Sequence, residues 1–459
     1  MIPEKLLEDI KARLNAKTIH DLRQVARAVG VPRPADGRME RLLDYIEKIA
    51  MGVCDPVGPA VRGAHPKSAE YDRQLVTDVF RCRAISLSDG EEDNGVHFEL
   101  SVGSGAEFDP LDFNGDGLLE KSGDKWFMRA SGADGSPIEV FVHENFVNKY
   151  GLREGDTVSG KCKRDSLDEM AGLVTVHAVN GAPAEGASER PFFDNLEPVY
   201  PCERIKIDCG QDGVTGRIVD LFAPVGKGQR AFITGPHGSG KTRLLKNIAL
   251  GIHSEGVKTV IALIDARPEE VSDFYKTFPD TDVFTSSFDA GYSGHVRTAK
   301  LALEYCKRRA ESGEDVVLLL DDLVRLTRAY NMCGKQFLSV IDSSAVGSVK
   351  KYLAAAKNTT EGGSLTIIAT LGSGEGEDEN TVLSALKDLC NMRINLSYDL
   401  ARAYVRPPID LAQTFSSHEE ALLTSEELSA AVKLRGKDIR EIIKIFENTG
   451  SDKELFKSL

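Results

Sequence analysis

Apolar runs and amphipathic segments alternate along the C-terminal half of the chain, from residue 198 onward. Amphipathic segments with apolar residues at helical spacing lie near Lys241–His253, His295–Ala310, Val346–Lys357 and Val382–Leu389. The apolar runs between them are expected to be strands: Arg230–Thr234, Thr259–Asp265, Val283–Ser286, Val316–Asp321, Leu365–Leu371 and Met392–Ser397. Apolar strands that alternate with helices are typical of a parallel sheet covered on both faces. We therefore expect an α/β domain over residues 190–459.

A different pattern, of short strands and turns, fills residues 117–182. The expected strands are Trp126–Met128, Ile138–Val142, Thr157–Lys163 and Leu173–Ala178. In the last of these, Val174, Val176 and Ala178 alternate with two polar residues, which predicts one buried face. Several short strands in so small a segment favour a β-barrel of the OB type.

Short amphipathic helices are expected in residues 1–51, near Ile19–Val29 and Met39–Ile49, with a break at Gly30–Pro32. Residues 52–116 are expected to be a linker or divergent insert, in which Leu75–Ile85 and Val96–Val102 are candidate strands. The chain is thus expected to be multidomain, with a helical domain, a barrel and an α/β domain in that order.

The net charge and the spacing of the cysteines limit the classes of function that this sequence can have. The formal net charge is −14, so a nucleic-acid site must be a local basic patch rather than a basic coat. The eight cysteines contain no Cys-x-x-Cys pair, which gives no indication of a zinc or redox motif. No apolar run reaches the ~20 residues that span a bilayer, and none at the N-terminus is of signal-peptide type. We expect a cytoplasmic protein without membrane contact.

The phosphate-binding pattern G-x-x-x-x-G-K-T is matched without exception. An expected strand precedes the loop and an expected helix follows it, so its amides and the helix N-terminus can hold phosphate oxygens. Lys241 would reach the outer phosphates of ATP, and Thr242 would bind Mg²⁺. The alternative is a chance glycine-rich turn. The predicted nucleotide-binding loop comprises Gly235, Pro236, His237, Gly238, Ser239, Gly240, Lys241 and Thr242.

A second acidic element supports a Mg²⁺-nucleotide site. The apolar strand Val316–Asp321 ends in a carboxylate, which is the expected partner of a P-loop metal. Thr242 and Asp321 are therefore the candidate metal ligands, with a buried strand that has an incidental acidic end as the alternative. Asp322 follows directly and is a candidate general base, or simply a solvated or capping residue.

An apparent calcium motif, Asp112–Gly117, resembles the start of an EF-hand loop. Its twelfth position is Gly123, so the bidentate glutamate is absent. We treat it as a coincidence.

Beyond the P-loop, many segments resemble the transcription termination factor Rho family. In the α/β domain they are Leu196–Pro201, Arg217–Arg230, Leu263–Val271, Arg325–Asn331, Glu361–Thr370 and Leu422–Leu428. Tyr150–Gly160 is similar to the cold-shock-like RNA-binding domain of that family, and Leu6–Ile49 to its N-terminal helical domain. The resemblance is close over Gly117–Leu459, loose over Met1–Met51, and misses most of Gly52–Asp116.

The resemblance implies a RecA-like ATPase domain and a homohexameric ring that binds single-stranded RNA, hydrolyses ATP between subunits and moves along RNA as a helicase. Arg267 and Arg328 match family arginines near the phosphates, and Asp265 also matches. We therefore expect any catalysis to be carried by Arg267, from the resemblance, and by Lys241, Asp321 and Asp322, from the motifs described above. Further candidate partners are a second Rho chain and RNA polymerase.

Several catalytic positions depart from the family pattern. The family glutamate that polarises the attacking water is replaced by Ala266, and such base assistance is worth about 10²–10⁴-fold. The arginine-finger position holds Ser416 or Ser417, a loss of about 10³–10⁵-fold in rate. Tyr404 stands at a second interface arginine, and Arg406 at the adenine-stacking aromatic, so Arg406 is the expected base contact. Arg402 and Arg406 alternate with Tyr404 on an expected strand, and either is a candidate replacement for the finger.

The RNA-contacting regions depart as well. One pore loop reads Gly334–Asp342, with Lys335 as its cation, and the other, Gly372–Glu379, has four acidic residues and no basic one, which repels phosphate. On the barrel, aromatic residues can stack on bases or belong to the barrel core. The candidate RNA contacts are Trp126, Phe127, Arg129, Phe141 and Lys335.

Two functions remain open from the sequence. The first is a Rho-type RNA-dependent ATPase and termination factor with impaired hydrolysis and translocation. The second is a non-catalytic Rho-like paralogue that binds nucleotide and RNA and assembles with, or modulates, another Rho chain. Ala266 and the acidic pore loop favour the second, whereas the intact P-loop and Asp321 support the first.

Overall fold

The computed structural model describes two compact units, Met1–Ser188 and Glu189–Leu459. The described residues are 4–29, 31, 38–51, 75, 79, 112–131, 137–164, 170–207, 213–333, 341–374, 376–449 and 451–458. Among them, no helix combines the length and the apolar character that crossing a membrane requires.

The first unit begins with three helices, α1 (Glu4–Asn15), α2 (Ile19–Val29) and α3 (Met39–Ala50). They bury apolar side chains such as Ile10, Leu22 and Ile46 in one cluster. Leu75 and Val79 are helical and fully buried in the same cluster. Residues four apart share one face of a helix, so the candidate strand Leu75–Ile85 was wrong at these two positions. The candidate strand Val96–Val102 lies outside the described residues.

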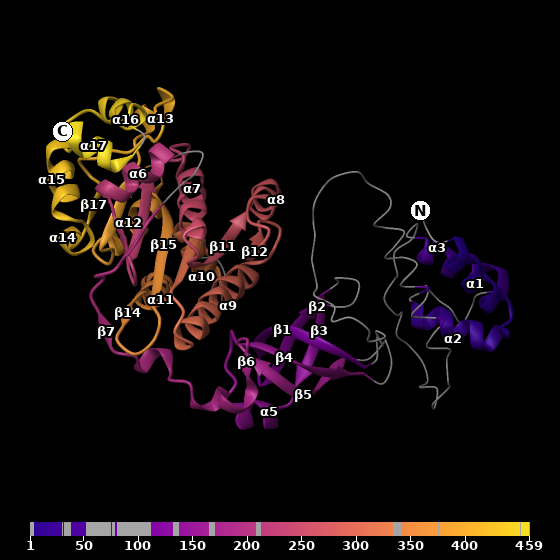
Figure 1. The fold of residues 1–459 in the computed structure, drawn as a ribbon. Helices are drawn as coiled ribbons and strands as arrows, with labels where there is room; N and C mark the ends of the chain where they lie inside the picture. The colour runs from indigo at the N-terminus through magenta and orange to yellow at the C-terminus, as the bar shows by residue number, and fades with distance from the viewer. Residues whose placement is uncertain are drawn as a thin grey trace. The chain divides into compact units, whose positions relative to one another are not determined.

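Five strands form a closed barrel of the OB type: β1 (Asp112–Ser122), β2 (Lys125–Ser131), β3 (Pro137–Val142), β4 (Thr157–Lys163) and β5 (Ala171–Val179). Their order is β3-β2-β1-β4-β5, and a β3–β5 pairing closes the barrel (Figure 1). Helix α5 (Glu144–Tyr150) connects β3 to β4, and β6 (Ala182–Pro183) extends the sheet beside β5. Leu119, Met128 and Val158 are fully buried inside. The expected barrel is confirmed.

The calcium-like segment lies within β1 and pairs with β4 along its whole length. Asp112 forms an ion pair with Lys161 across this pairing, with 3.1 Å between Oδ2 and Nζ. Because an EF-hand loop must curl around its ion, an extended paired strand does not supply that geometry.

Strand β5 does not follow the simple alternation that the sequence suggested. Its pairing with β4 shifts register twice, which leaves Val174 and His177 as extra residues on β5. Each β-bulge moves the following side chains to the opposite face. Val174 is therefore 47% exposed whereas Leu173 and Val176 are buried, and the expectation that Val174 shares the buried face was wrong.

A seven-stranded sheet forms the centre of the second unit, in the order β12-β11-β13-β15-β10-β16-β17 (Figure 1). The first six strands run parallel, and β17 is antiparallel to β16. The strands are β10 (Arg230–Gly235), β11 (Lys258–Ala266), β12 (Asp282–Ser287), β13 (Val316–Asp321), β15 (Leu365–Gly372), β16 (Met392–Asn395) and β17 (Phe415–Ser416).

Helices cover both faces of this sheet. On one face, Ile233, Ile261 and Leu319 share a core with residues of α6, α7, α8 and α16. Alternate strand residues such as Phe232, Val260 and Leu318 point the other way and are equally buried, where α9 and α10 pack. The principal helices are α6 (Gly213–Phe222), α7 (Lys241–Ser254), α8 (Pro268–Thr277), α9 (Tyr292–Glu311), α10 (Leu323–Met332), α11 (Ser343–Ala354) and α12 (Glu377–Leu386).

Smaller elements complete the second unit. The C-terminal helices are α13 (Tyr398–Arg402), α14 (Glu419–Leu422), α15 (Ser425–Leu434), α16 (Ile439–Glu447) and α17 (Asp452–Ser458). Two short pairs join β7 (Pro198–Val199) to β14 (Asn358–Thr359) and β8 (Arg204–Ile205) to β9 (Val225–Gly226). Two 3₁₀ turns are η2 (Ala184–Glu189), at the end of the first unit, and η3 (Phe193–Asn195).

The expected strand through Arg402, Tyr404 and Arg406 is wrong. Arg402 ends helix α13, and Tyr404 adopts a left-handed backbone conformation with φ of 57°. The amide of Tyr404 donates to the carbonyl of Ala401 in a turn. Arg402 and Arg406 therefore do not share a strand face, so a shared strand does not support either residue as a replacement arginine finger.

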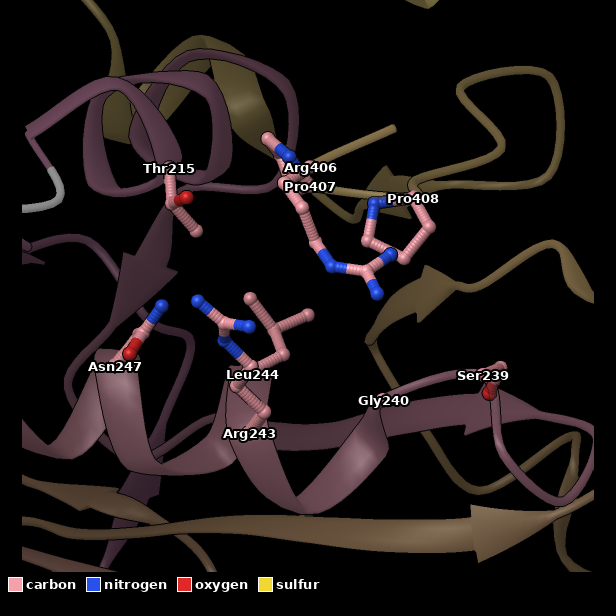
Figure 2. A pocket seen from close by; sticks show the side chains of 9 residues that line it. All are labelled: Thr215, Ser239, Gly240, Arg243, Leu244, Asn247, Arg406, Pro407 and Pro408. Carbon is pink, nitrogen blue, oxygen red and sulfur yellow. The ribbon is translucent and has the colours of Figure 1, made fainter. Parts of the chain in front are cut away.

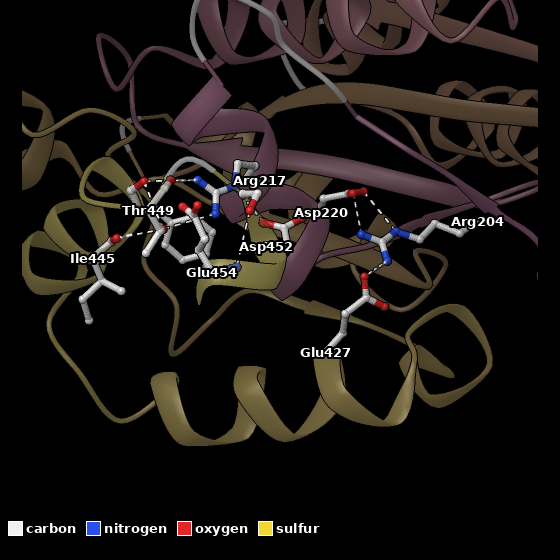
Figure 3. A network of polar contacts seen from close by, with 10 residues as sticks. Arg204, Arg217, Asp220, Glu427, Ile445, Thr449, Asp452 and Glu454 are labelled. Carbon is white, nitrogen blue, oxygen red and sulfur yellow. Dashed lines mark hydrogen bonds and ion pairs between the residues drawn. The ribbon is translucent and has the colours of Figure 1, made fainter. Parts of the chain in front are cut away.

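Two arginines join α6 and the preceding β8 to the C-terminal helices (Figure 3). Arg217 donates to Asp452 Oδ1 at 2.7 Å and to the Thr449 carbonyl at 2.6 Å. Arg204 donates from Nη1 to Glu427 Oε1 at 2.8 Å and from Nε to Asp220 Oδ1 at 3.2 Å. Burial raises the pKa of Asp220 to about 6, although Arg204 opposes the shift.

Removing one partner of this buried pair should be costly. The side chains of Arg204 and Asp220 are only 12% and 13% exposed, so Arg204→Met would leave a carboxylate buried without its cation. We expect a loss of about 3–5 kcal/mol in the free energy of unfolding, measured by urea denaturation at pH 7. The double variant Arg204→Met/Asp220→Asn should recover much of the loss. Arg440→Met, at an exposed ion pair, should change nothing measurable; equal losses in the single and double variants would contradict this account.

Candidate nucleotide-binding site

The phosphate loop connects β10 to α7, as the sequence predicted. Gly238 and Gly240 have φ values of 77° and 94°, a conformation that side-chain-bearing residues rarely adopt. At Gly235 a Cβ atom would lie 2.6 Å from the Ser239 hydroxyl. The loop backbone therefore needs glycine at these positions, which allows successive amides to face one anion.

Lys241 is the first residue of α7 and folds back over the loop. Its Nζ donates to the carbonyls of Gly235, at 2.8 Å, and Pro236, at 3.0 Å. Ser239 donates to the same Pro236 carbonyl at 2.8 Å, which fixes the turn. His237 is exposed at the tip of the loop. The ammonium group is thus held beside the glycine-rich backbone, where it can meet a phosphate.

The candidate metal ligands are in direct contact. Thr242 Oγ1 donates to Asp321 Oδ2 at 2.6 Å, and Thr370 donates to the other oxygen of Asp321. The order β13-β15-β10 brings these residues together, because the carboxyl ends of parallel strands meet at one edge of the sheet. A hydroxyl and a carboxylate are suitable Mg²⁺ ligands when phosphates and water supply the rest. No cluster of three or more His, Cys, Asp or Glu residues suited to a metal occurs among the described residues.

Ala266 ends β11 near this pair, since Leu263 of β11 pairs with Asp321. Ala266 is 4% exposed and belongs to the core on one face of the sheet. The preceding Asp265 has φ of 55° at a register shift between β11 and β12. His295 lies 3.9 Å from its carboxylate and is bonded through Nδ1 to Ser286 at 2.7 Å. The side chain at position 266 therefore supplies no carboxylate, and Asp265 lies near the buried His295.

Asp322 acts as the N-cap of α10. Its Oδ1 accepts the backbone amide of Arg325 at 2.8 Å, which matches the capping alternative. Burial and the neighbouring Asp321 raise the pKa of Asp322 to about 6, while the Arg325 amide opposes the shift. Capping occupies only one carboxylate oxygen, so a role for Asp322 as a base stays a prediction.

The two predicted phosphate arginines lie at the surface. Arg267 is exposed at the start of α8. Arg328 is exposed on α10 and forms an ion pair with Asp378 of α12, with 2.9 Å between Nε and Oδ2. Asp378 belongs to the acidic segment Gly372–Glu379, so this segment holds one of the candidate phosphate ligands. The roles of both arginines stay predictions.

The two serines at the arginine-finger position do not offer a cation. Ser416 is buried in β17, where its hydroxyl accepts from Gln229 Nε2 at 2.8 Å and donates to the Pro224 carbonyl at 2.9 Å. Tyr404, at the second interface position, is 86% exposed.

A pocket beside the phosphate loop receives Arg406 (Figure 2). Helices α6 and α7 form one side, with Thr215, Arg243 and Asn247, which the sequence reasoning missed. A usable signal was present: Arg243 and Asn247 are four residues apart and share a face of the helix that follows the P-loop. The lining residues are Thr215, Ser239, Gly240, Arg243, Leu244, Asn247, Arg406, Pro407 and Pro408.

On the barrel, the candidate RNA contacts divide between two faces. Trp126 packs against the barrel core, with Lys121 Nζ 5.3 Å from its ring centre. Phe127 and Phe141 pair across β2 and β3 in an edge-on contact of 6.1 Å between ring centres. Arg129 shares their outer face and lies 3.3 Å from Glu120 and 3.7 Å from Glu139. Lys335 lies outside the described residues.

Two family models match the chain. The nucleotide-binding domain of the ATP synthase alpha/beta family covers residues 215–416, and the RNA-binding domain of Rho termination factor covers residues 115–185. The transcription termination factor Rho of Streptobacillus moniliformis is 34% identical over 339 residues, which cover 70% of this chain and 81% of that protein. This chain belongs to the transcription termination factor Rho family. The Rho of Pseudomonas fluorescens is similar at 36% identity, with 71% and 80% covered.

Some Rho proteins are considerably longer than the matching region. The Rho of Mycobacterium tuberculosis is 37% identical over 333 residues, which are 70% of this chain but 55% of that protein, so this chain spans about half of such relatives. A solved type III secretion ATPase is also similar, with 25% identity, a TM-score of 0.46, and 59% of this chain and 80% of that chain covered. Rho membership gives the chain an RNA-binding barrel and a nucleotide-binding domain.

The contact between Thr242 and Asp321 gives a test of the metal site. Thr242→Val keeps the side-chain shape but removes the hydroxyl, which should weaken Mg²⁺-dependent ATP binding about 10- to 100-fold, as expected for hydrogen bonds to charged groups. Titration calorimetry with and without Mg²⁺ measures the effect. Thr381→Val, at an exposed α12 hydroxyl that donates to the Glu377 carbonyl at 2.8 Å, is the matched control. Equal Mg²⁺ dependence in Thr242→Val and the unmodified protein would exclude Thr242 as a ligand.

Proposed function

We propose that this protein is a Rho-type transcription termination factor that binds a Mg²⁺-nucleoside triphosphate in the second unit and single-stranded RNA on the barrel, with impaired hydrolysis. The observation that most strongly supports the proposal is the contact between Thr242 and Asp321 beside a complete phosphate loop. At the end of β11, Ala266 contributes only a methyl group. These groups support Mg²⁺-nucleotide binding, whereas the end of β11 offers no carboxylate to activate water.

The proposed roles follow from the geometry. Loop amides and Lys241 hold the phosphates, while Thr242 and Asp321 hold Mg²⁺, which neutralises phosphate charge when bound. Arg267 and Arg328 are the candidates for stabilising charge that develops on the phosphate. Asp322 and Asp265 are the nearby carboxylates that remain for proton transfer.

RNA binding is proposed for the outer face of β2 and β3. Phe127 and Phe141 present ring edges and faces that can stack on unpaired bases. Arg129 adds a cation, although Glu120 and Glu139 lie close to it. The proposed assembly is a homohexameric ring, and a second Rho chain and RNA polymerase are proposed partners.

The non-catalytic alternative rests on the same residue, Ala266. If no other carboxylate activates water, the protein holds nucleotide without turning it over. Its function would then be to assemble with, or modulate, a catalytically complete Rho chain.

Nucleotide hydrolysis by the purified full chain, with and without poly-pyrimidine RNA, distinguishes these functions. We expect slow turnover that RNA stimulates and that Lys241→Ala abolishes, measured as phosphate release. Asp322→Asn would then identify the base if it reduces turnover without reducing Mg²⁺-nucleotide binding. Binding without any turnover would favour the non-catalytic function, and the absence of both would contradict the nucleotide site.

A gain of function tests the missing carboxylate directly. Ala266→Glu should raise turnover, up to about 10²–10⁴-fold where base assistance is the limiting loss. Ala266→Gln has the same size without a basic group and should leave turnover unchanged. Because Ala266 is buried, the thermal midpoint of both variants must be compared first. Equal turnover in the two folded variants would mean that Ala266 is not what limits hydrolysis.

A further inference from the structure

The pocket beside the phosphate loop carries two guanidinium groups from separate parts of the chain (Figure 2). Arg243 extends from the first turn of α7, and Arg406 reaches in from the segment that follows α13. Ser239 and Gly240 belong both to the phosphate loop and to the pocket wall. A nucleotide with its phosphates in the loop therefore has its base end beside these arginines. This inference rests on the proposed nucleotide binding and concerns which base is bound.

Neither arginine is neutralised by the pocket. Among the described residues that line it, none carries a carboxylate, although the chain has 71 acidic residues against 57 basic ones. Arg243 is exposed and makes no hydrogen bond or ion pair with the part of the chain that the structure describes. Arg406 uses Nη1 to reach the carbonyls of Ala401, at 3.2 Å, and Val405, at 3.0 Å. These two bonds hold its guanidinium at the pocket and leave Nε and Nη2 for a ligand.

The chemistry of these groups selects between purines. A guanidinium only donates hydrogen bonds, so its ligand must offer acceptors. Guanine presents two adjacent acceptors, O6 and N7, which fit an arginine in a bidentate manner, whereas adenine presents an amino donor at the corresponding six-position. The amino group of adenine needs a hydrogen-bond acceptor, and neither arginine can provide one.

The remaining pocket residues suit the rest of a guanine ring. Guanine also has hydrogen-bond donors, on a ring nitrogen and on its amino group, and these donors need acceptors. Asn247 and Thr215 each carry an oxygen that can accept a hydrogen bond. Leu244, Pro407 and Pro408 are buried residues that supply apolar walls for the ring faces. The pocket therefore offers a guanine ring three kinds of contact: guanidinium donors, oxygen acceptors, and apolar side chains that can pack against the ring faces.

We propose that this pocket binds guanine nucleotides in preference to adenine nucleotides, with Arg243 and Arg406 as the specificity-determining residues. The expected preference for GTP over ATP is about 10- to 100-fold, the range that one good bidentate contact gives.

Titration calorimetry of the full chain with Mg²⁺ and GTP, ITP or ATP tests the proposal. ITP retains O6 and N7 but lacks the amino group, so GTP and ITP should both bind more tightly than ATP. Arg243→Gln and Arg406→Gln should each lower the ratio of GTP affinity to ATP affinity about tenfold or more, because the lost donors serve guanine more than adenine. Arg440→Gln, on α16 and not part of the pocket, should preserve the preference, and thermal midpoints verify folding.

Other outcomes would overturn the inference in distinguishable ways. ATP binding as tight as GTP binding would refute guanine selection and leave the nucleotide site intact. Tighter binding of adenosine 3′,5′-bisphosphate than of GTP would mean that the arginines hold an additional phosphate instead. Failure of every nucleotide to bind, with Lys241→Ala indistinguishable from the unmodified protein, would refute the nucleotide site itself.

Discussion

The hydrogen bond between Thr242 and Asp321 joins two elements that are distant in sequence, and the candidate site is organised around it. Thr242 follows β10 and Asp321 ends β13, with β15 between the two strands. Thr370 of β15 donates to the second oxygen of Asp321, so the start of α7 and two neighbouring strands position one carboxylate. The edge at which parallel strands end is where α/β sheets place ligands, because loop amides and helix N-termini converge there. The phosphate loop, Ala266 and Asp322 all lie around this fixed point.

Around that centre, the family framework is retained while the reactive groups differ. The backbone turn of the loop depends on glycines at positive φ, and it is complete. At the end of β11, by contrast, Ala266 contributes to the core and carries no group that accepts a proton. A methyl group in that position contributes to packing and cannot take part in proton transfer.

The pocket proposed to bind the nucleotide base is distinguished by its positive charge. Arg243 and Arg406 bring two cations to a pocket whose described lining residues include apolar walls and no carboxylate. Elsewhere in this unit, Arg328 of α10 forms an ion pair with Asp378 of the acidic segment. Positive charge is therefore concentrated where a base would lie, and partly neutralised at the acidic segment. On the barrel, the charge of Arg129 is likewise partly neutralised, because the carboxylates of Glu120 and Glu139 lie close to it.

The sequence alone determined the elements whose signal is local or periodic. The phosphate loop is a contiguous pattern, and the buried strands of the sheet are apolar runs, so both could be predicted together with the family, the barrel and Asp321. Tertiary structure decided what depends on register or on residues far apart. The bulges of β5 exposed Val174, the left-handed turn at Tyr404 removed the expected strand, and helical packing buried Leu75 and Val79. Arg243 and Arg406 are separated by more than a hundred residues, and only the folded chain brings both guanidinium groups to one pocket.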